Sequence, residues 1–134
     1  MFELNLLSLI INSCSTLNVR RDKQHYRLDF YINKSKIYNL ELNKLLNKVT
    51  KEVEFLYNTK LNRYYLHGHN AIKALELFDK LNIINYVPFE DFNNKVVTVL
   101  NNKDLFTRAM GKPYSEEERN KLEELYQEFN AKTN

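Results

Sequence analysis

The most regular feature of the chain is a strict alternation of apolar and polar positions over residues 26–32. A period of two places successive side chains on opposite faces of a β-strand. Leu17–Arg20 alternates in the same way, and the charged connection Arg20–Gln24 predicts a hairpin loop between the two strands. We therefore predict a hairpin with one apolar and one polar face. In the second strand the apolar positions are Tyr26, Leu28, Phe30 and Ile32, and the polar positions are Arg27, Asp29 and Tyr31.

Two more alternating segments, Val53–Asn58 and Asn62–His67, predict a second hairpin that ends at Gly68. Apolar residues at three- and four-residue steps predict helices over residues 37–49 and 71–81. The expected N-caps are Ser35 and Asn70. The apolar stripes are Ile37, Leu40, Leu45, Leu46 and Val49 in the first helix, opposite the polar Lys44, Asn47 and Lys48, and Ile72, Leu75, Phe78 and Leu81 in the second.

The segment Leu7–Val19 supplies a helix before the first hairpin. Leu7–Ile11 is apolar enough for a buried helix, Asn12–Thr16 is small and polar, and a strand begins at Leu17. The elements then follow one another as helix, strand, strand, helix, strand, strand, helix. Sequential hairpins of this kind can join into one antiparallel sheet. We therefore expect an α+β fold in which helices back a four-stranded antiparallel sheet.

The chain continues into a C-terminal extension after this core. Ile83–Phe92 predicts an irregular connection that contains Pro88, and Lys95–Leu100 fits a strand through its β-branched residues but also a helix through its spacing. Ser115–Glu118 has the form of a capping box and predicts a terminal helix. The apolar stripe of that helix is Leu122, Leu125, Tyr126 and Phe129.

Composition supports one folded unit over residues 1–134. A hydrophobic content of 43%, with 8 Phe and 9 Tyr, supplies a core, and only 2 Gly and 2 Pro argue against a loop-rich β-sandwich. The single Cys14 forms no internal disulfide and no zinc cluster, which favours a reducing compartment. The N-terminal segment lacks the basic flank of a signal peptide and its apolar run is too short to span a membrane.

Charge is distributed unevenly along the chain. Residues 1–68 carry 11 Lys and Arg against 6 Asp and Glu, whereas residues 69–134 carry 9 against 11. The basic first half is suited to phosphate, although Asp29 and Glu54 on the predicted sheet dilute its field, and the acidic second half is suited to solvent or a protein partner.

The segment Leu7–Ser15 resembles a degenerate form of the LAGLIDADG motif of homing endonucleases and intron maturases, in which a helix ends in two carboxylates and a glycine before a strand. Asn12 falls on the first aspartate of that motif, Cys14 on the second, metal-binding aspartate, and Ser15 on the glycine. The αββαββα order over about residues 5–82 is also that of the family, with residues 83–134 as a C-terminal helical extension. The resemblance favours a helix over Lys95–Leu100.

The resemblance implies a particular chemistry and its loss here. In the family, two motif helices pack together, and the carboxylate that ends each helix holds divalent metal at the scissile phosphates. An amide at Asn12 is neutral, and a thiol at Cys14 is a soft ligand that Mg²⁺ disfavours. We therefore expect no nuclease activity, no catalytic residues, no metal site and no cofactor. The family also pairs two motif helices through a small residue that Leu9 replaces here, so the formation of a homodimer stays open.

In the family the polar face of the sheet lies along nucleic acid. Arginine binds phosphate through two parallel hydrogen bonds, and tyrosine stacks on unpaired bases. The candidate nucleic-acid-binding residues are Asn18, Arg20, Arg21, Lys23, Arg27, Tyr31, Arg63, Tyr65 and His67.

The expected function is therefore that of a catalytically inactive, LAGLIDADG-derived protein that binds nucleic acid, RNA in preference to DNA. It would serve in an organellar ribonucleoprotein such as the ribosome, with its acidic C-terminal helices on neighbouring proteins, or as an intron-splicing cofactor. The alternatives are a divergent homodimeric homing endonuclease that cleaves DNA, and a small phage-type protein-binding module. Abundant Asn, Lys, Ile, Leu and Tyr, with no Trp, suggest an AT-rich coding sequence from an organellar genome, a phage or a low-GC bacterium. With no targeting peptide, we expect an organelle-encoded protein in the mitochondrial matrix or another organelle, and otherwise a cytoplasmic one.

Overall fold

The computed structural model describes residues 2–22, 25–33, 44, 46, 48, 51, 53–84, 90–107 and 113–131. The strands are β1 (Ser15–Asp22), β2 (His25–Asn33), β3 (Leu56–Asn58) and β4 (Arg63–His67). The helices with defined bounds are α1 (Phe2–Cys14), α3 (Gly68–Lys80), α4 (Glu90–Asn101), α5 (Lys103–Phe106) and α6 (Glu116–Ala131).

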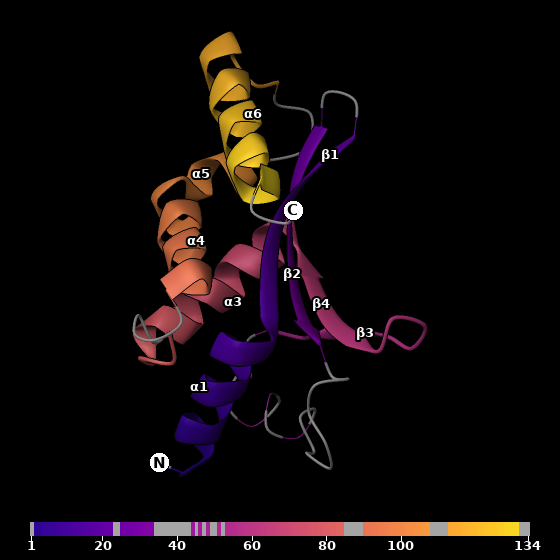
Figure 1. Ribbon diagram of the computed structural model, residues 1–134, viewed down its shortest axis with the longest axis vertical. Helices are drawn as coiled ribbons and strands as arrows, with labels where there is room; N and C mark the ends of the chain where they lie inside the picture. Colours follow the sequence, from indigo (N-terminus) through magenta and orange to yellow (C-terminus); the bar gives the residue numbers. More distant parts are fainter. Residues whose placement is uncertain are drawn as a thin grey trace.

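The four strands form one antiparallel sheet in the order β1-β2-β4-β3 (Figure 1). β1 pairs with β2 along its whole length, from Ser15 opposite Ile32 to Asp22 opposite His25. β4 pairs with β2 on one side and with β3 on the other. The predicted α+β fold with a four-stranded antiparallel sheet is therefore confirmed.

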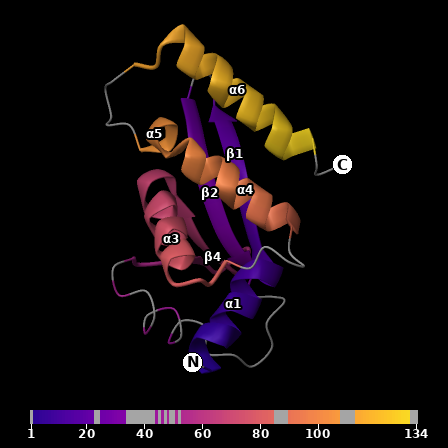
Figure 2. The ribbon, with the colours of Figure 1, turned by 90° about the vertical axis from the view of Figure 1, so that its left-hand side faces the viewer.

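Helices cover one face of this sheet. α4 and α6 lie side by side across β1 and β2, α3 lies beside them, and α1 lies at one end of the sheet (Figures 1 and 2). The alternation in β2 explains this arrangement, because Leu28, Phe30 and Ile32 are fully buried beneath the helices while Tyr26 is half-buried. The largest buried side chains that complete the core are Leu7, Ile11, Leu17, Leu46, Leu66, Ile72, Phe78 and Phe129.

The two predicted hairpins differ from the observed ones at their ends. β1 continues to Asp22 and β2 begins at His25, so the prediction that Arg20–Gln24 is a loop was wrong for its first three residues. The ladder continues through Arg20 opposite Arg27 and Arg21 opposite Tyr26 to Asp22 opposite His25. The third strand is also shorter than predicted, since only Leu56–Asn58 pairs with β4 and Val53 is buried outside the sheet.

The helix predicted over residues 37–49 lies largely outside the described residues, as does its predicted cap Ser35. At the positions that the structure describes, residues 44, 46 and 48 are helical. Leu46 is buried, and Lys44 and Lys48 are exposed, as the helical spacing predicts.

The junction between β4 and α3 corrects the predicted N-cap. α3 begins at Gly68 rather than after Asn70, and its N-cap residue His67 is extended and makes no side-chain capping bond. Gly68 has a φ of 53°, a left-handed conformation that glycine adopts without a Cβ clash. This glycine lets the strand pass directly into the helix.

The C-terminus of α3 forms a Schellman motif. Asn82 has a φ of 58°, its N–H donates to the Asp79 carbonyl at 3.1 Å, and the Ile83 N–H donates to the Phe78 carbonyl at 2.8 Å. This turn directs the Ile83 carbonyl toward α1, where it accepts hydrogen bonds from the Ser8 hydroxyl at 2.6 Å and the Asn12 amide at 2.8 Å.

α4 shows that Lys95–Leu100 is helical, as the resemblance favours. The helix begins at Glu90, so the prediction of an irregular connection was wrong for its last three residues, and the Pro88 region lies outside the described residues. Phe92, Val96 and Val99 are buried along one side of the helix. Their burial outweighs the strand preference of the β-branched residues.

The terminal helix α6 begins with the predicted capping box. The Ser115 N–H donates to Glu118 Oε1 at 2.9 Å, and the Glu118 N–H donates to Ser115 Oγ at 3.1 Å. The predicted stripe packs on β1, with Leu122, Leu125 and Phe129 buried and Tyr126 half-buried. Among the described residues, no helix combines the length and apolar character that a membrane span requires.

Lowering the pH is expected to weaken the contact between α6 and the first hairpin. A hydrogen bond from Tyr26 is the main cause that holds the pKa of the Glu123 carboxyl below its ordinary 4.5, with contributions from Gln127 and Arg21. This stabilisation is complete above pH 4.5 and is lost as the pH falls through the depressed pKa of the folded state. Thermal unfolding across the acidic range should therefore show a flatter pH dependence for Glu123→Gln than for wild type. Parallel curves would contradict the assignment.

Candidate nucleic-acid interface

The face of the sheet opposite the helices carries polar side chains, and no helix with defined bounds covers it (Figure 1). The strand register brings together residues that are far apart in sequence. Asp29 of β2 lies between Asn18 of β1 and His67 of β4, and Tyr31 lies opposite Tyr65. We call this surface the polar face, and its β1, β2 and β4 members are Thr16, Asn18, Arg20, Asp22, His25, Arg27, Asp29, Tyr31, Asn33, Arg63, Tyr65 and His67.

Asp29 is the buried centre of the polar face. Only 3% of its side chain is exposed, and its carboxylate accepts hydrogen bonds from three neighbours. The donors are Arg27 Nε at 2.8 Å, Tyr31 Oη at 2.9 Å and, in the tautomer with a proton on that nitrogen, His67 Nδ1 at 2.8 Å. Because a buried carboxylate is costly unless paired, this arrangement holds the three neighbouring side chains in place.

Tyr31 is fixed by its hydrogen bond to Asp29 and by a contact with Arg63. Burial, followed by the hydrogen bond to Asp29, raises the pKa of the Tyr31 hydroxyl above its ordinary value, so the group stays protonated and donates at neutral pH. The guanidinium of Arg63 lies 3.8 Å from the centre of the Tyr31 ring, a cation–π contact. Next to this pair, the rings of Tyr65 and His67 have their centres 5.0 Å apart.

A hollow of about 290 Å³ opens on the polar face. It brings together six of the nine predicted nucleic-acid-binding residues, and none of the described residues that line it is acidic. Asn58 and Leu61 also line it but were not predicted; Asn58 Oδ1 accepts a hydrogen bond from the Leu61 N–H at 3.0 Å and so shapes the turn after β3. We call it the polar-face hollow, and its lining residues are Arg20, Arg27, Tyr31, Asn58, Leu61, Arg63, Tyr65 and His67.

The other three predicted residues lie elsewhere. Arg21 is on the opposite face, where it pairs with Glu123 and lies over the ring of Tyr126 at 4.4 Å. Asn18 belongs to the polar face but does not line the hollow, and its Oδ1 is buried without a hydrogen-bond partner. Lys23 lies outside the described residues.

The end of α1 bears on the metal chemistry that the motif implies. Asn12 is buried, and its amide nitrogen donates to the Ser8 carbonyl at 2.6 Å and to the Ile83 carbonyl at 2.8 Å. Cys14 is buried in the core and only 7% exposed.

These side chains do not fit a magnesium site. Mg²⁺ requires hard, anionic oxygen ligands, whereas this helix end offers an amide turned toward carbonyl groups and a buried thiol. Within the described part of the chain, no three His, Cys, Asp or Glu side chains lie close enough to hold a metal ion. Asn12 and Cys14 therefore do not supply the ligands that a magnesium-dependent step at the end of α1 would need.

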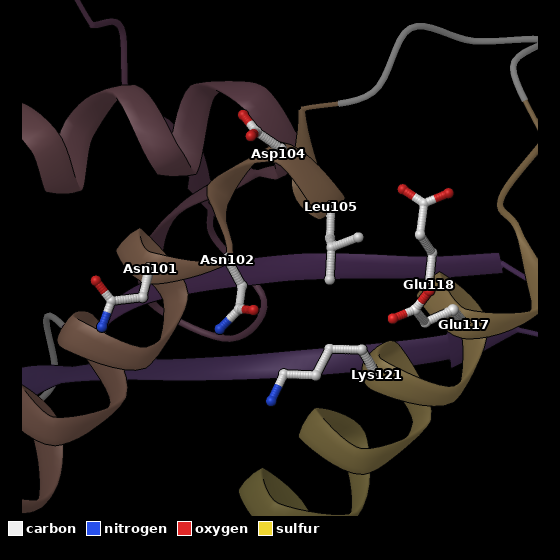
Figure 3. A pocket seen from close by; sticks show the side chains of 7 residues that line it. All are labelled: Asn101, Asn102, Asp104, Leu105, Glu117, Glu118 and Lys121. Carbon is white, nitrogen blue, oxygen red and sulfur yellow. The ribbon is translucent and has the colours of Figure 1, made fainter.

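A second hollow, of about 300 Å³, lies on the helical side of the molecule (Figure 3). Its lining side chains come from the end of α4, from α5 and from the first turns of α6, and three of them are acidic against one lysine. We call it the acidic hollow, and its lining residues are Asn101, Asn102, Asp104, Leu105, Glu117, Glu118 and Lys121.

Comparison with known proteins gives structural likenesses only, because no protein-family model and no curated protein sequence matches the chain. The homing endonuclease I-TnaI superposes with a TM-score of 0.52 at 18% identity, over 95% of this chain and 87% of that protein. I-CvuI, in complex with its target, gives a TM-score of 0.42 at 9% identity over 96% and 95% of the two chains. The LAGLIDADG homing endonuclease I-LtrWI, bound to target DNA, gives 0.40 at 17% identity over 90% and 48%.

The likeness to I-TnaI extends over nearly the whole of both chains, which at this identity is a likeness of fold. It agrees with the motif-like helix α1 that leads directly into β1, and with the antiparallel sheet β1-β2-β4-β3 backed by helices. The protein therefore has the LAGLIDADG-like fold of the homing endonuclease I-TnaI, as the segment Leu7–Ser15 predicts.

Proposed function

We propose that the protein binds nucleic acid, RNA in preference to DNA, through the polar face of its sheet, and that it does not cleave it. The polar-face hollow carries the proposal, because it gathers three arginines and a histidine, and the lining residues that the structure describes include no acid. Such a surface attracts phosphate, and its aromatic rings suit the unpaired bases through which proteins read RNA.

The proposed loss of cleavage is supported by the end of α1. The nitrogen of Asn12 is committed to the carbonyls of Ser8 and Ile83, and the thiol of Cys14 is buried. The position that carries metal chemistry in the motif therefore has a structural role in this chain.

Binding and cleavage can be tested with one set of matched oligonucleotides. Purified protein is titrated into single-stranded RNA, single-stranded DNA and AT-rich duplex DNA of the same sequence, at low and moderate salt. We expect the tightest binding to RNA, weaker binding as salt rises, and no site-specific nicking with Mg²⁺ or Mn²⁺. Arg63→Ala should weaken binding, whereas Lys73→Ala, which removes an exposed cation from α3 on the helical side, should not.

Two outcomes would contradict the proposal. Site-specific nicking would favour the divergent homing endonuclease. Failure to bind any nucleic acid at low salt would favour the protein-binding module.

The acidic hollow favours a protein partner as a second contact. Asp104, Glu117 and Glu118 offer a surface suited to a basic protein segment, on the side of the molecule away from the polar face. A protein with RNA on one side and a basic protein on the other would fit a component of an organellar ribonucleoprotein such as the ribosome, or an intron-splicing cofactor. Identification of the RNA and proteins that co-purify with the native protein tests this role.

A further inference from the structure

We propose that the polar-face hollow binds a single unpaired nucleotide, with its phosphate on Arg20, Arg27 and Arg63 and its base against Tyr65 and His67. The inference rests on the proposed function and specifies which part of an RNA the face recognises. It predicts a preference for loops, bulges or single strands over a continuous duplex.

The shape of the surface is the first argument. At about 290 Å³ the hollow is close to the lower end of the sizes of small-ligand sites, roughly 300 Å³. A duplex presents a convex backbone and keeps its bases inside. A nucleotide extruded from its stack presents both a phosphate and a ring face to one such hollow.

The charges in the hollow are the second argument. Arg20 and Arg63 have no carboxylate partner among the side chains that the structure describes. Arg27 directs Nε and Nη2 toward Asp29, which leaves Nη1 available. The carboxylate of Asp29 is buried and already accepts three donors, so it orients Arg27 without facing a ligand.

The guanidinium of Arg63 is held in place. It lies over the ring of Tyr31, and its Nε is buried without a hydrogen-bond partner among the described residues. A guanidinium fixed in this way loses little conformational freedom when it binds, and a phosphate oxygen is the acceptor that it matches best.

The apolar part of the hollow is the third argument. Tyr65 and His67 form one aromatic wall, and Leu61 on the turn after β3 is 54% exposed beside it. An exposed leucine next to three arginines is poorly suited to a row of phosphates but well suited to the face of a base. Tyr31 is not the stacking residue, because Arg63 already occupies its ring.

The experiment compares a short RNA hairpin that has an unpaired loop with a fully paired RNA duplex of the same stem sequence. Anisotropy titrations give the two affinities, and 2-aminopurine placed in turn at each loop position reports stacking by fluorescence quenching. We expect wild type to bind the hairpin about tenfold more tightly than the duplex, and one loop position to be quenched.

The decisive variant is Tyr65→Leu, with Tyr65→Phe as its control. Tyr65→Leu removes the aromatic face and leaves the arginines, so it should abolish the tenfold preference and the quenching while salt-dependent binding to both RNAs persists. Tyr65→Phe keeps the ring and should retain both. Circular dichroism and thermal unfolding show whether the two variants remain folded to the same extent.

The outcomes separate this inference from the proposed function. Equal affinity for hairpin and duplex, or a preference that survives Tyr65→Leu, would overturn the inference and leave nucleic-acid binding in place. Absence of binding to both RNAs would overturn the proposed function, and the inference with it.

Discussion

Phe30→Ala is expected to lower the free energy of unfolding by about 3–5 kcal/mol. Phe30 is fully buried in the central strand β2, and its ring centre lies 6.1–6.4 Å from those of Phe55, Phe78 and Phe92. Truncation removes the contacts that join the sheet to α3 and α4, and the surrounding rings cannot fill the space without moving.

Urea unfolding followed by circular dichroism measures this loss. A suitable control is Val97→Ala, a large-to-small change on α4 at a side chain that is 39% exposed, which should change the stability by no more than about 0.5 kcal/mol. Phe30→Leu keeps part of the contact and allows a measurement if the alanine variant does not fold. A loss no greater than that of Val97→Ala would contradict the role of Phe30.

The effect should extend to the polar face. Phe30 separates Asp29 from Tyr31 in β2, so the same strand that is anchored in the core presents the network around the Asp29 carboxylate. A folded Phe30→Leu variant should therefore also bind RNA more weakly, although it changes no residue of the polar-face hollow.

The faces of the sheet could be predicted because a period of two in the sequence has only one structural meaning. Tyr26, Leu28, Phe30 and Ile32 alternate with polar residues, and burial of the last three confirmed the assignment. The local pattern could not predict whether Lys95–Leu100 is a strand or a helix, because its β-branched residues alone favour a strand. The helix is stabilised by the burial of Val96 and Val99 in the core.

The candidate site could be predicted in part for the same reason. Six lining residues of the hollow occupy polar positions of alternating strands, whereas Asn58 and Leu61 belong to the end of β3 and its turn, and no periodicity shows which turn lies beside a surface. Arg21 was assigned to a loop. Once β1 is known to continue to Asp22, parity places Arg21 on the same face as Leu17 and Val19, against α6.

The sequence of β2 alone could not predict that Asp29 orients neighbouring side chains. As an acid on a polar face it was expected to weaken a positive field. The sheet order β1-β2-β4 surrounds it with neighbours on both sides, and its charge is used to orient Arg27, Tyr31 and His67. The signal lay in the pairing between β2 and β4, which are neighbours in the sheet although β3 lies between them in sequence.

Asn12→Asp, the change toward the family motif, is expected to destabilise the protein by about 3 kcal/mol or more at neutral pH. In the wild type the Asn12 amide donates to the carbonyls of Ser8 and Ile83. A carboxylate has no proton to donate, so the variant would place a buried negative charge against two acceptors, and the Ile83 carbonyl is held in place by the turn after α3.

The pH dependence distinguishes this cause from a general loss of packing. Burial and the two carbonyls would raise the pKa of the new carboxyl above its unfolded value, so the folded state would bind a proton more tightly than the unfolded state. The deficit of Asn12→Asp relative to wild type should then shrink as the pH falls through that raised pKa, because a protonated carboxyl can donate to a carbonyl. Urea unfolding at a series of pH values measures this.

Ser13→Asp is the matched control, since it adds the same charge one residue further along α1 at an exposed position. Its cost should stay below about 1 kcal/mol, the scale of an acid near a helix C-terminus, and should show no comparable recovery at low pH. Equal stability of Asn12→Asp and wild type would mean that the Asn12 amide does not join α1 to the turn after α3. The expected result would show that the Asn12 amide joins α1 to the turn after α3, and that an aspartate at this position destabilises that contact.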